Sequence, residues 1–163
     1  MESNIFEAIQ QYVYYDQLLK STPDKIFPLL CPKKEYDWIE SWKCDIIFSN
    51  SGFAELDCVF VTGLPEDTKE TWIVDIFDKD KKIQFARFSR SRIIRHSISL
   101  TDNKNGTTTA KWEQTITSLN SEGNLYIEKF FKIEFEKRIK ALEKMLNYYL
   151  TTGKMLRTNN ESK

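Results

Sequence analysis

One stretch near the end of the chain, residues 124–150, constrains the fold more than any other. Its apolar residues recur in steps of three and four, at Ile127, Phe131, Phe135, Ile139, Leu142, Leu146 and Tyr149. This spacing predicts one amphipathic α-helix of roughly seven turns, with Asn124 or Ser121 as its N-cap and Gly153 just beyond its end. Because such a helix must bury a wide apolar face, the rest of the chain is expected to provide the surface that it covers.

The chain before this helix predicts a strand, two short helices and then a run of about six strands. We expect strands at 5–20, 43–48, 58–62, 70–77, 82–88, 93–100 and 107–119, short helices at 22–30 and 35–42, and turns at 63–67 and 102–106. Consecutive strands with short turns favour an antiparallel meander. The predicted fold is therefore α+β, with a curved antiparallel sheet of six or seven strands wrapped around the last helix. A cavity can remain between sheet and helix.

Charge and length limit the classes of function. The 163 residues suit one domain, expected over residues 1–153 and followed by a polar tail at 154–163. Lysine plus arginine and aspartate plus glutamate both number 24, and no segment concentrates basic charge, so nucleic acid is not an expected partner. The sequence shows neither a signal-peptide pattern nor an integral membrane segment, so we predict a cytoplasmic protein. The oligomeric state is left open.

Cysteine, histidine and glycine usage argues against a bound metal or cofactor. Cys31, Cys44 and Cys58 are an odd set without CxxC spacing, and the chain has one histidine, so we expect buried thiols and no metal site. Neither GxGxxG nor GxSxG occurs among the five glycines. We therefore expect no nucleotide-binding loop, no serine nucleophile and no cofactor.

Strand alternation places candidate binding residues on the inner face of the sheet. His96 shares a face with Ile94 and Ile98, so it is expected inside. It is either an acid–base or ligand-binding group, and so the candidate catalytic residue, or a histidine satisfied by a neighbour. Gln114 shares a face with Trp112, a wall residue, and bonds either a ligand or a neighbouring group.

Arg87 shares one face of its predicted strand with Phe85, and it would reach the cavity if that face points inward. There its guanidinium could bind a carboxylate or enolate oxygen. The opposite phase leaves Arg87 on a solvated rim, and the pattern does not decide between them. Trp72 is expected to line the same inner face, while Phe131 and Phe135 of the long helix would form the roof of the cavity.

The densest aromatic cluster, Tyr36, Trp38 and Trp42, lies between the short helices and the second strand. These rings could form a lid over a flat ligand, with Tyr36 or Asp37 presenting a polar group. They could equally anchor the short helices to the sheet.

Five short segments, together with the element order, carry a resemblance to a known superfamily. They are Cys31-Pro32, 35–39, 42–44, 51–55 and Cys58-Val59-Phe60, supported by Asn105-Gly106-Thr107 ahead of the last strand. The chain resembles, over residues 5–152, the START-like (SRPBCC) superfamily of polyketide cyclases and dehydratases, birch-pollen allergens and lipid-transfer domains, and locally an uncharacterised bacterial branch of it. The resemblance implies a helix-grip fold and a cavity for a hydrophobic or amphipathic small molecule or lipid. It implies no catalytic residue, because the superfamily has no universal catalytic motif.

Three functions compete on this basis. The first is a carrier or sensor that binds a hydrophobic small molecule or lipid. The second is a cyclase or dehydratase acting on an aromatic or polyketide-like substrate, with His96 as acid–base and Arg87 or Tyr36 stabilising an enolate. The third is a co-chaperone-like interaction module that uses exposed rings at Trp38 and Trp42.

Overall fold

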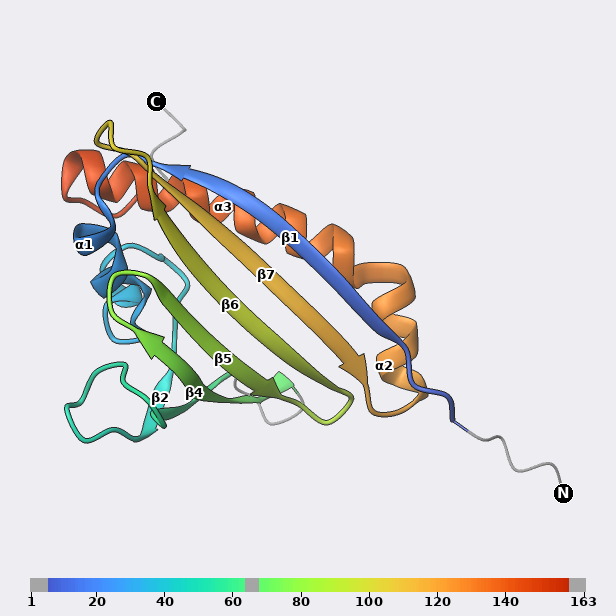
Figure 1. Ribbon diagram of the computed structural model, residues 1–163. Helices are drawn as coiled ribbons and strands as arrows, with labels where there is room; N and C mark the ends of the chain where they lie inside the picture. Colours follow the sequence, from blue (N-terminus) through green and yellow to red (C-terminus); the bar gives the residue numbers. More distant parts are fainter. Residues whose placement is uncertain (1–5, 64–67, 159–163) are drawn as a thin grey trace, which may run out of the picture.

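A computed structural model describes residues 6–63 and 68–158, and it confirms the predicted helix-grip fold (Figure 1). Seven antiparallel strands form one sheet in the order β1-β7-β6-β5-β4-β3-β2. The strands are β1 (Gln10–Leu19), β2 (Asp45–Phe48), β3 (Val59–Thr62), β4 (Glu70–Asp78), β5 (Lys82–Phe88), β6 (Arg92–Asp102) and β7 (Thr108–Ser118). Residues 64–67, where a turn is predicted, lie outside the described residues.

Short helices follow β1, as predicted, and one long helical segment follows β7. The short ones are α1 (Pro23–Ile26), η1 (Phe27–Leu30) and η2 (Glu35–Asp37); the long segment comprises α2 (Ser121–Tyr126), the π-helical turn η4 (Ile127–Phe131) and α3 (Lys132–Thr152). The predicted apolar stripe is confirmed. Its members from Ile127 to Leu146 are buried, and Tyr149 is half-buried.

The N-cap of the long segment differs from the prediction. It is Asn120, whose side-chain oxygen accepts a hydrogen bond from the Gly123 amide at 3.0 Å, and neither Asn124 nor Ser121. The reason is that β7 ends at Ser118 and the chain turns into the helix within two residues, so the last extended residue is Asn120. Gly153 ends the helix as predicted, with φ +69° and its amide donating to the Tyr149 carbonyl at 2.8 Å.

Helix α3 runs alongside β1, an edge strand, and bonds its open backbone (Figure 1). The Glu143 carboxylate accepts from the Leu18 amide at 2.7 Å. The Asn147 side chain accepts from the Lys20 amide at 2.8 Å and donates to the Leu18 carbonyl at 2.9 Å. These bonds pair groups that an edge strand would otherwise leave open to another chain, and they fix the helix relative to the sheet.

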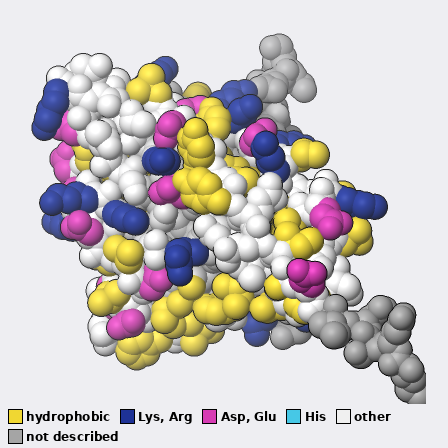
Figure 2. All heavy atoms as spheres, turned by 45° about the vertical axis from the view of Figure 1, so that its right-hand side comes forward, with side chains coloured by type: hydrophobic (Ala, Val, Ile, Leu, Met, Phe, Trp, Pro, Cys, Tyr) yellow, Lys and Arg dark blue, Asp and Glu magenta, His cyan; other side chains and the backbone are white. Residues whose placement is uncertain are grey.

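The surface shows mixed charge, as the composition predicts. Figure 2 shows basic and acidic side chains mixed on one face, with hydrophobic side chains gathered in a band along its lower part and no histidine in view. In the part of the chain that the structure describes, no helix is both long and apolar enough to cross a bilayer.

We predict that Gly123→Ala lowers the free energy of unfolding by about 1–3 kcal/mol, the usual cost of an overpacked site. A Cβ at this buried position would lie 2.1 Å from the Ser91 carbonyl oxygen and 3.0 Å from the Ser118 Cβ. Urea unfolding of both variants measures the effect, with Ser121→Ala, an exposed change in the same helix, as the control. Equal unfolding free energies for the two variants would contradict this packing of α2 on the sheet.

Candidate functional site

The concave face of the sheet and α3 enclose a cavity of about 200 Å³, here called the inner cavity. Most of its wall is aromatic or aliphatic. The lining residues are Glu35, Ile39, Trp42, Phe60, Thr62, Trp72, Phe85, Arg87, His96, Ile98, Trp112, Gln114, Arg138, Ile139 and Leu142. They come from η2, the loop after it, strands β3 to β7 and α3.

Strand register arranges the polar residues of the inner cavity. Phe85 pairs with His96 across β5 and β6, and His96 pairs with Gln114 across β6 and β7. Two residues further along β5, Arg87 pairs with Trp72 of β4. Side chains paired in this way lie on the same face of a sheet, so the three polar groups reach the inner cavity among aromatic rings.

The rings pack at ordinary aromatic distances. Phe60 stacks on Trp72 with 5.2 Å between ring centroids, and Phe85 meets Trp72 edge-on at 5.6 Å. Trp112 meets the His96 ring edge-on at 5.4 Å. The Trp112 indole nitrogen is buried without a hydrogen-bond partner among the described residues.

His96 is buried, and its side chain has one hydrogen-bond partner among the described residues, Gln114. The Gln114 amide nitrogen lies 2.6 Å from His96 Nδ1. If that nitrogen donates to Nδ1, the ring hydrogen sits on Nε2, which has no partner in the described parts of the chain. Burial, reinforced by the charge of Arg87, lowers the pKa of His96 to about 3. The imidazole is thus a neutral polar group at physiological pH and not a proton donor of the usual imidazolium kind.

The Arg87 side chain faces inward, and two of its five N–H donors bond the Glu70 carboxylate. Its Nε and Nη2 bond the Glu70 carboxylate at 3.1 and 2.7 Å, and its guanidinium lies 4.2 Å from the centroid of the Trp72 ring. A bidentate ion pair stacked on an indole is a rigid arrangement. The charge of Arg87 is therefore present at the cavity but largely compensated.

Glu35 is a cavity residue that sequence reasoning did not single out. The turn that carries it is fixed by its own backbone bonds, from Glu35 N to the Cys31 carbonyl at 2.9 Å and from Ile39 N to the Glu35 carbonyl at 2.8 Å. Burial raises the pKa of Glu35 to about 8, opposed by the nearby positive charge of Arg138. A single acidic residue in a short 3-10 turn has no periodicity that could have assigned it to the cavity.

The three residues of the aromatic cluster have different positions. Trp38 is fully buried and donates to the Leu29 carbonyl at 2.8 Å, outside the cavity lining. Trp42 lines the inner cavity and donates to the Pro32 carbonyl at 2.8 Å. The Tyr36 hydroxyl bonds the backbone of Cys44 at the surface. Of the two rings expected in an exposed interaction patch, Trp38 is fully buried and Trp42 is half-buried.

A second space, the adjoining chamber, continues the inner cavity toward α2. It has a volume of about 360 Å³ and shares Arg87, Gln114, Arg138 and Ile139 with the inner cavity. Its other lining residues are Glu70, Arg92, Ile94, Tyr126, Phe131, Glu134 and Phe135, so the predicted roof residues Phe131 and Phe135 lie here.

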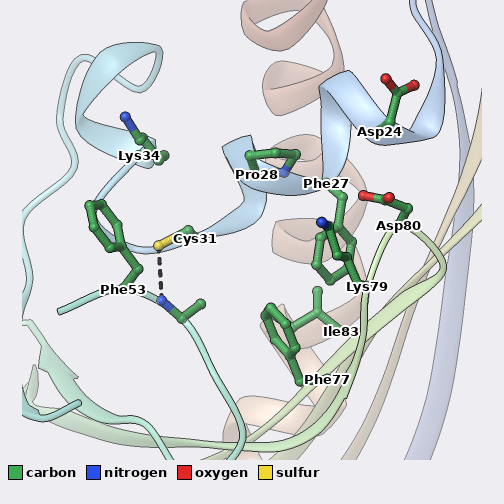
Figure 3. A pocket seen from close by; sticks show the side chains of 11 residues that line it. Asp24, Phe27, Pro28, Cys31, Lys34, Phe53, Phe77, Lys79, Asp80 and Ile83 are labelled. Atoms are coloured by element: carbon green, nitrogen blue, oxygen red, sulfur yellow. Dashed lines mark hydrogen bonds between the residues drawn. The ribbon is translucent and has the colours of Figure 1, made fainter. Parts of the chain in front are cut away.

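A surface pocket of about 370 Å³ lies outside the sheet–helix interior, between η1, the loop at 49–57 and the β4–β5 turn. Figure 3 shows Phe27, Phe53 and Phe77 around the hollow, with Lys34 on one side and Asp80 on the other. It contains none of the predicted binding residues. It therefore serves as a control region in the experiments below.

Comparison with known proteins supports the fold. No family model matches the chain, and no curated protein matches it in sequence. Mll3558 from Rhizobium loti has a similar structure, with a TM-score of 0.64 and 11% identity over 88% of this chain and 99% of that one. Norcoclaurine synthase from Thalictrum flavum has a TM-score of 0.65 and 8% identity, covering 89% of this chain and 88% of its own.

DynU16, from the dynemicin biosynthetic locus, has a TM-score of 0.60 and 13% identity, over 88% of this chain and 48% of DynU16. Identities this low show a shared fold alone. The comparisons therefore support the helix-grip fold of this chain.

We predict that His96 stays neutral from pH 8 to pH 5. Burial in an aromatic site opposes its protonation, and its pKa of about 3 lies below this range. Since the chain has one histidine, its imidazole NMR signals are assigned without mutation. A titration midpoint near the ordinary value of 6.5 would show instead that His96 is solvated.

Proposed function

We propose that the protein binds a small molecule with a single aromatic ring in the inner cavity. The observation that carries this proposal is the unused bonding capacity of the cavity. His96 Nε2 and the Gln114 carbonyl oxygen have no partner among the described residues, and they face a space walled by aromatic rings. Pockets with an apolar wall and a few fixed polar groups are typical ligand sites.

Volume sets the size of the ligand. A dry cavity of about 150 Å³ is enough to bind benzene, so about 200 Å³ fits one ring with a small substituent. Burying the surface of one ring contributes about 4–5 kcal/mol, which corresponds to a dissociation constant of about 0.2–1 mM before polar contacts are added. A larger amphipathic molecule or lipid, the broader expectation from the sequence, would also have to occupy the adjoining chamber.

Proteins of the same fold make this proposal reasonable. Norcoclaurine synthase, 9% identical over 85% of this chain with a TM-score of 0.62, has a structure in complex with dopamine and hydroxybenzaldehyde, both single-ring compounds. We further propose that residues 1–153 act as one START-like domain of a bacterial branch of the superfamily. Binding would then be the shared property, with the ligand set by the wall of each cavity.

A second candidate function, proton transfer on the bound arene, is favoured by Glu35. A carboxyl whose pKa is raised to about 8 can donate and accept a proton near neutral pH, whereas His96 stays neutral there. In a cyclase- or dehydratase-like reaction, Glu35 and not His96 would therefore be the acid–base group. Turnover that survives Glu35→Gln would exclude this assignment.

We predict that wild-type protein binds hydroxybenzaldehyde and that Ile98→Phe weakens binding at least tenfold. Ile98 is buried in the cavity wall, and a larger side chain there fills the space needed by the ring. Isothermal titration calorimetry measures the affinity, and circular dichroism checks that the variant is folded.

Phe53→Ala is the matched control, because Phe53 lines the surface pocket in Figure 3 and not the inner cavity. It should leave the affinity unchanged. If Phe53→Ala abolishes binding and Ile98→Phe does not, the ligand lies in the surface pocket and the proposal is wrong.

A further inference from the structure

The adjoining chamber holds more positive charge than its lining compensates, and this excess bears on the ligand. We propose that the ligand is an arene that carries a carboxylate, with its ring in the inner cavity and its carboxylate in the adjoining chamber between Arg92 and Arg138. This inference rests on the proposed function, since it assumes that the inner cavity takes a ring. It adds the charge of the ligand and the residues that recognise it.

Arg92 has no acidic partner among residues 6–63 and 68–158. Its guanidinium lies 3.7 Å from the centroid of the Tyr126 ring, and within the described part of the chain it makes one side-chain hydrogen bond, a long one of 3.4 Å from Nη1 to the Ser91 hydroxyl. Its Nε is buried without a partner among the described residues. A guanidinium held by stacking, with donors left over, is suited to accept a carboxylate from outside.

Arg138 supplies the second charge. It lines both the inner cavity and the adjoining chamber from α3, and no carboxylate of the described residues lies within ion-pair distance of it. Partial burial lowers the pKa of Arg138, while the carboxyl of Glu35 raises it. Arg87, between the two spaces, is compensated by Glu70 and contributes mainly its rigid position.

The acidic groups of the lining do not cancel this charge. Glu70 is engaged by Arg87, and Glu134 accepts a hydrogen bond from the Tyr126 hydroxyl at 2.7 Å. The pKa of Glu35 is raised to about 8, so at pH 7 its carboxyl is mostly protonated. Three guanidinium groups then face two carboxylates across the joined spaces. An anion fits this balance, and an ammonium group does not.

Three probes with one carbon skeleton test the charge of the ligand: 3-phenylpropionate, 3-phenylpropanol and 3-phenylpropylamine. We expect the carboxylate to bind at least tenfold more tightly than the alcohol, and the amine to bind most weakly, in calorimetric titrations at pH 7 and low salt. Equal affinities, or tightest binding of the amine, would overturn the inference while leaving the proposed function intact. If none of the three binds, both the inference and the proposed function fail.

Arginine variants test the location of the carboxylate. Arg92→Gln should weaken 3-phenylpropionate binding at least tenfold and leave 3-phenylpropanol binding within twofold, because Arg92 lines the adjoining chamber and not the inner cavity. Arg138→Gln, which also changes the wall of the inner cavity, should weaken binding of the acid at least tenfold more than binding of the alcohol. Arg95→Gln is the matched control, because Arg95 lies on the same strand as Arg92 but is exposed and absent from both linings. A loss that is equal for the acid and the alcohol, or equal in Arg95→Gln, would overturn the proposed subsite.

The pH dependence gives a further test. As pH rises from 7 to 9, Glu35 ionises and adds a negative charge to the wall, so 3-phenylpropionate affinity should fall several-fold while 3-phenylpropanol affinity stays constant. The titratable groups near Glu35 do not account for such a change: His96 is already neutral, the pKa of the Cys44 thiol is raised, and the Glu35 carboxyl raises the pKa of Arg138 against the effect of burial. Glu35→Gln should remove the fall. An unchanged fall in Glu35→Gln would contradict the assignment to Glu35.

Discussion

The hydrogen bonds between α3 and the open edge of β1 are the constraint on which the interior depends. Glu143 and Asn147 hold the helix beside β1, and the Gln17 side chain donates to the Ile139 carbonyl at 2.9 Å. The backbone of helix α3 lies closer to β1 than to the other strands of the curved sheet. Aromatic side chains from β3 to β7 extend into the space on the far side but do not fill it, and the remaining volume is the inner cavity.

The sequence predicted the features that repeat along one element. The stripe on the long helix and the alternation of Ile94, His96 and Ile98 each depend on a local period, and burial follows both patterns. The pairing of Arg87 with Glu70 could not be predicted, because it depends on which residues of β4 and β5 lie opposite one another. Glu35 was missed for a related reason, since a 3-10 turn between a helix and a strand has no period to indicate its inward face.

Several polar groups of this interior are arranged at a cost to stability. A buried donor without a partner destabilises a protein by about 1–3 kcal/mol, and Trp112 Nε1 and Arg92 Nε are two such donors among the described residues. Apolar residues of similar shape would avoid that cost. A histidine–glutamine pair and three arginines lie around the two joined spaces, and the proposed ligand would offset the cost of placing them there.

The titration of His96 and Glu35 makes the stability of the folded protein depend on pH. Unfolded His96, with a pKa near 6.5, takes up a proton that folded His96, with a pKa of about 3, does not, so its contribution to stability is lost as pH falls from 6.5 toward 3. Glu35 acts in the opposite direction. Its folded form, with a pKa of about 8, keeps a proton that the unfolded form releases above 4.5, so stability falls as pH rises toward 8. A bound carboxylate would add to this second effect, because it favours the protonated form of Glu35. Under the proposed function, ligand binding and proton binding would therefore be linked at Glu35, which joins the short helix η2 to the inner cavity.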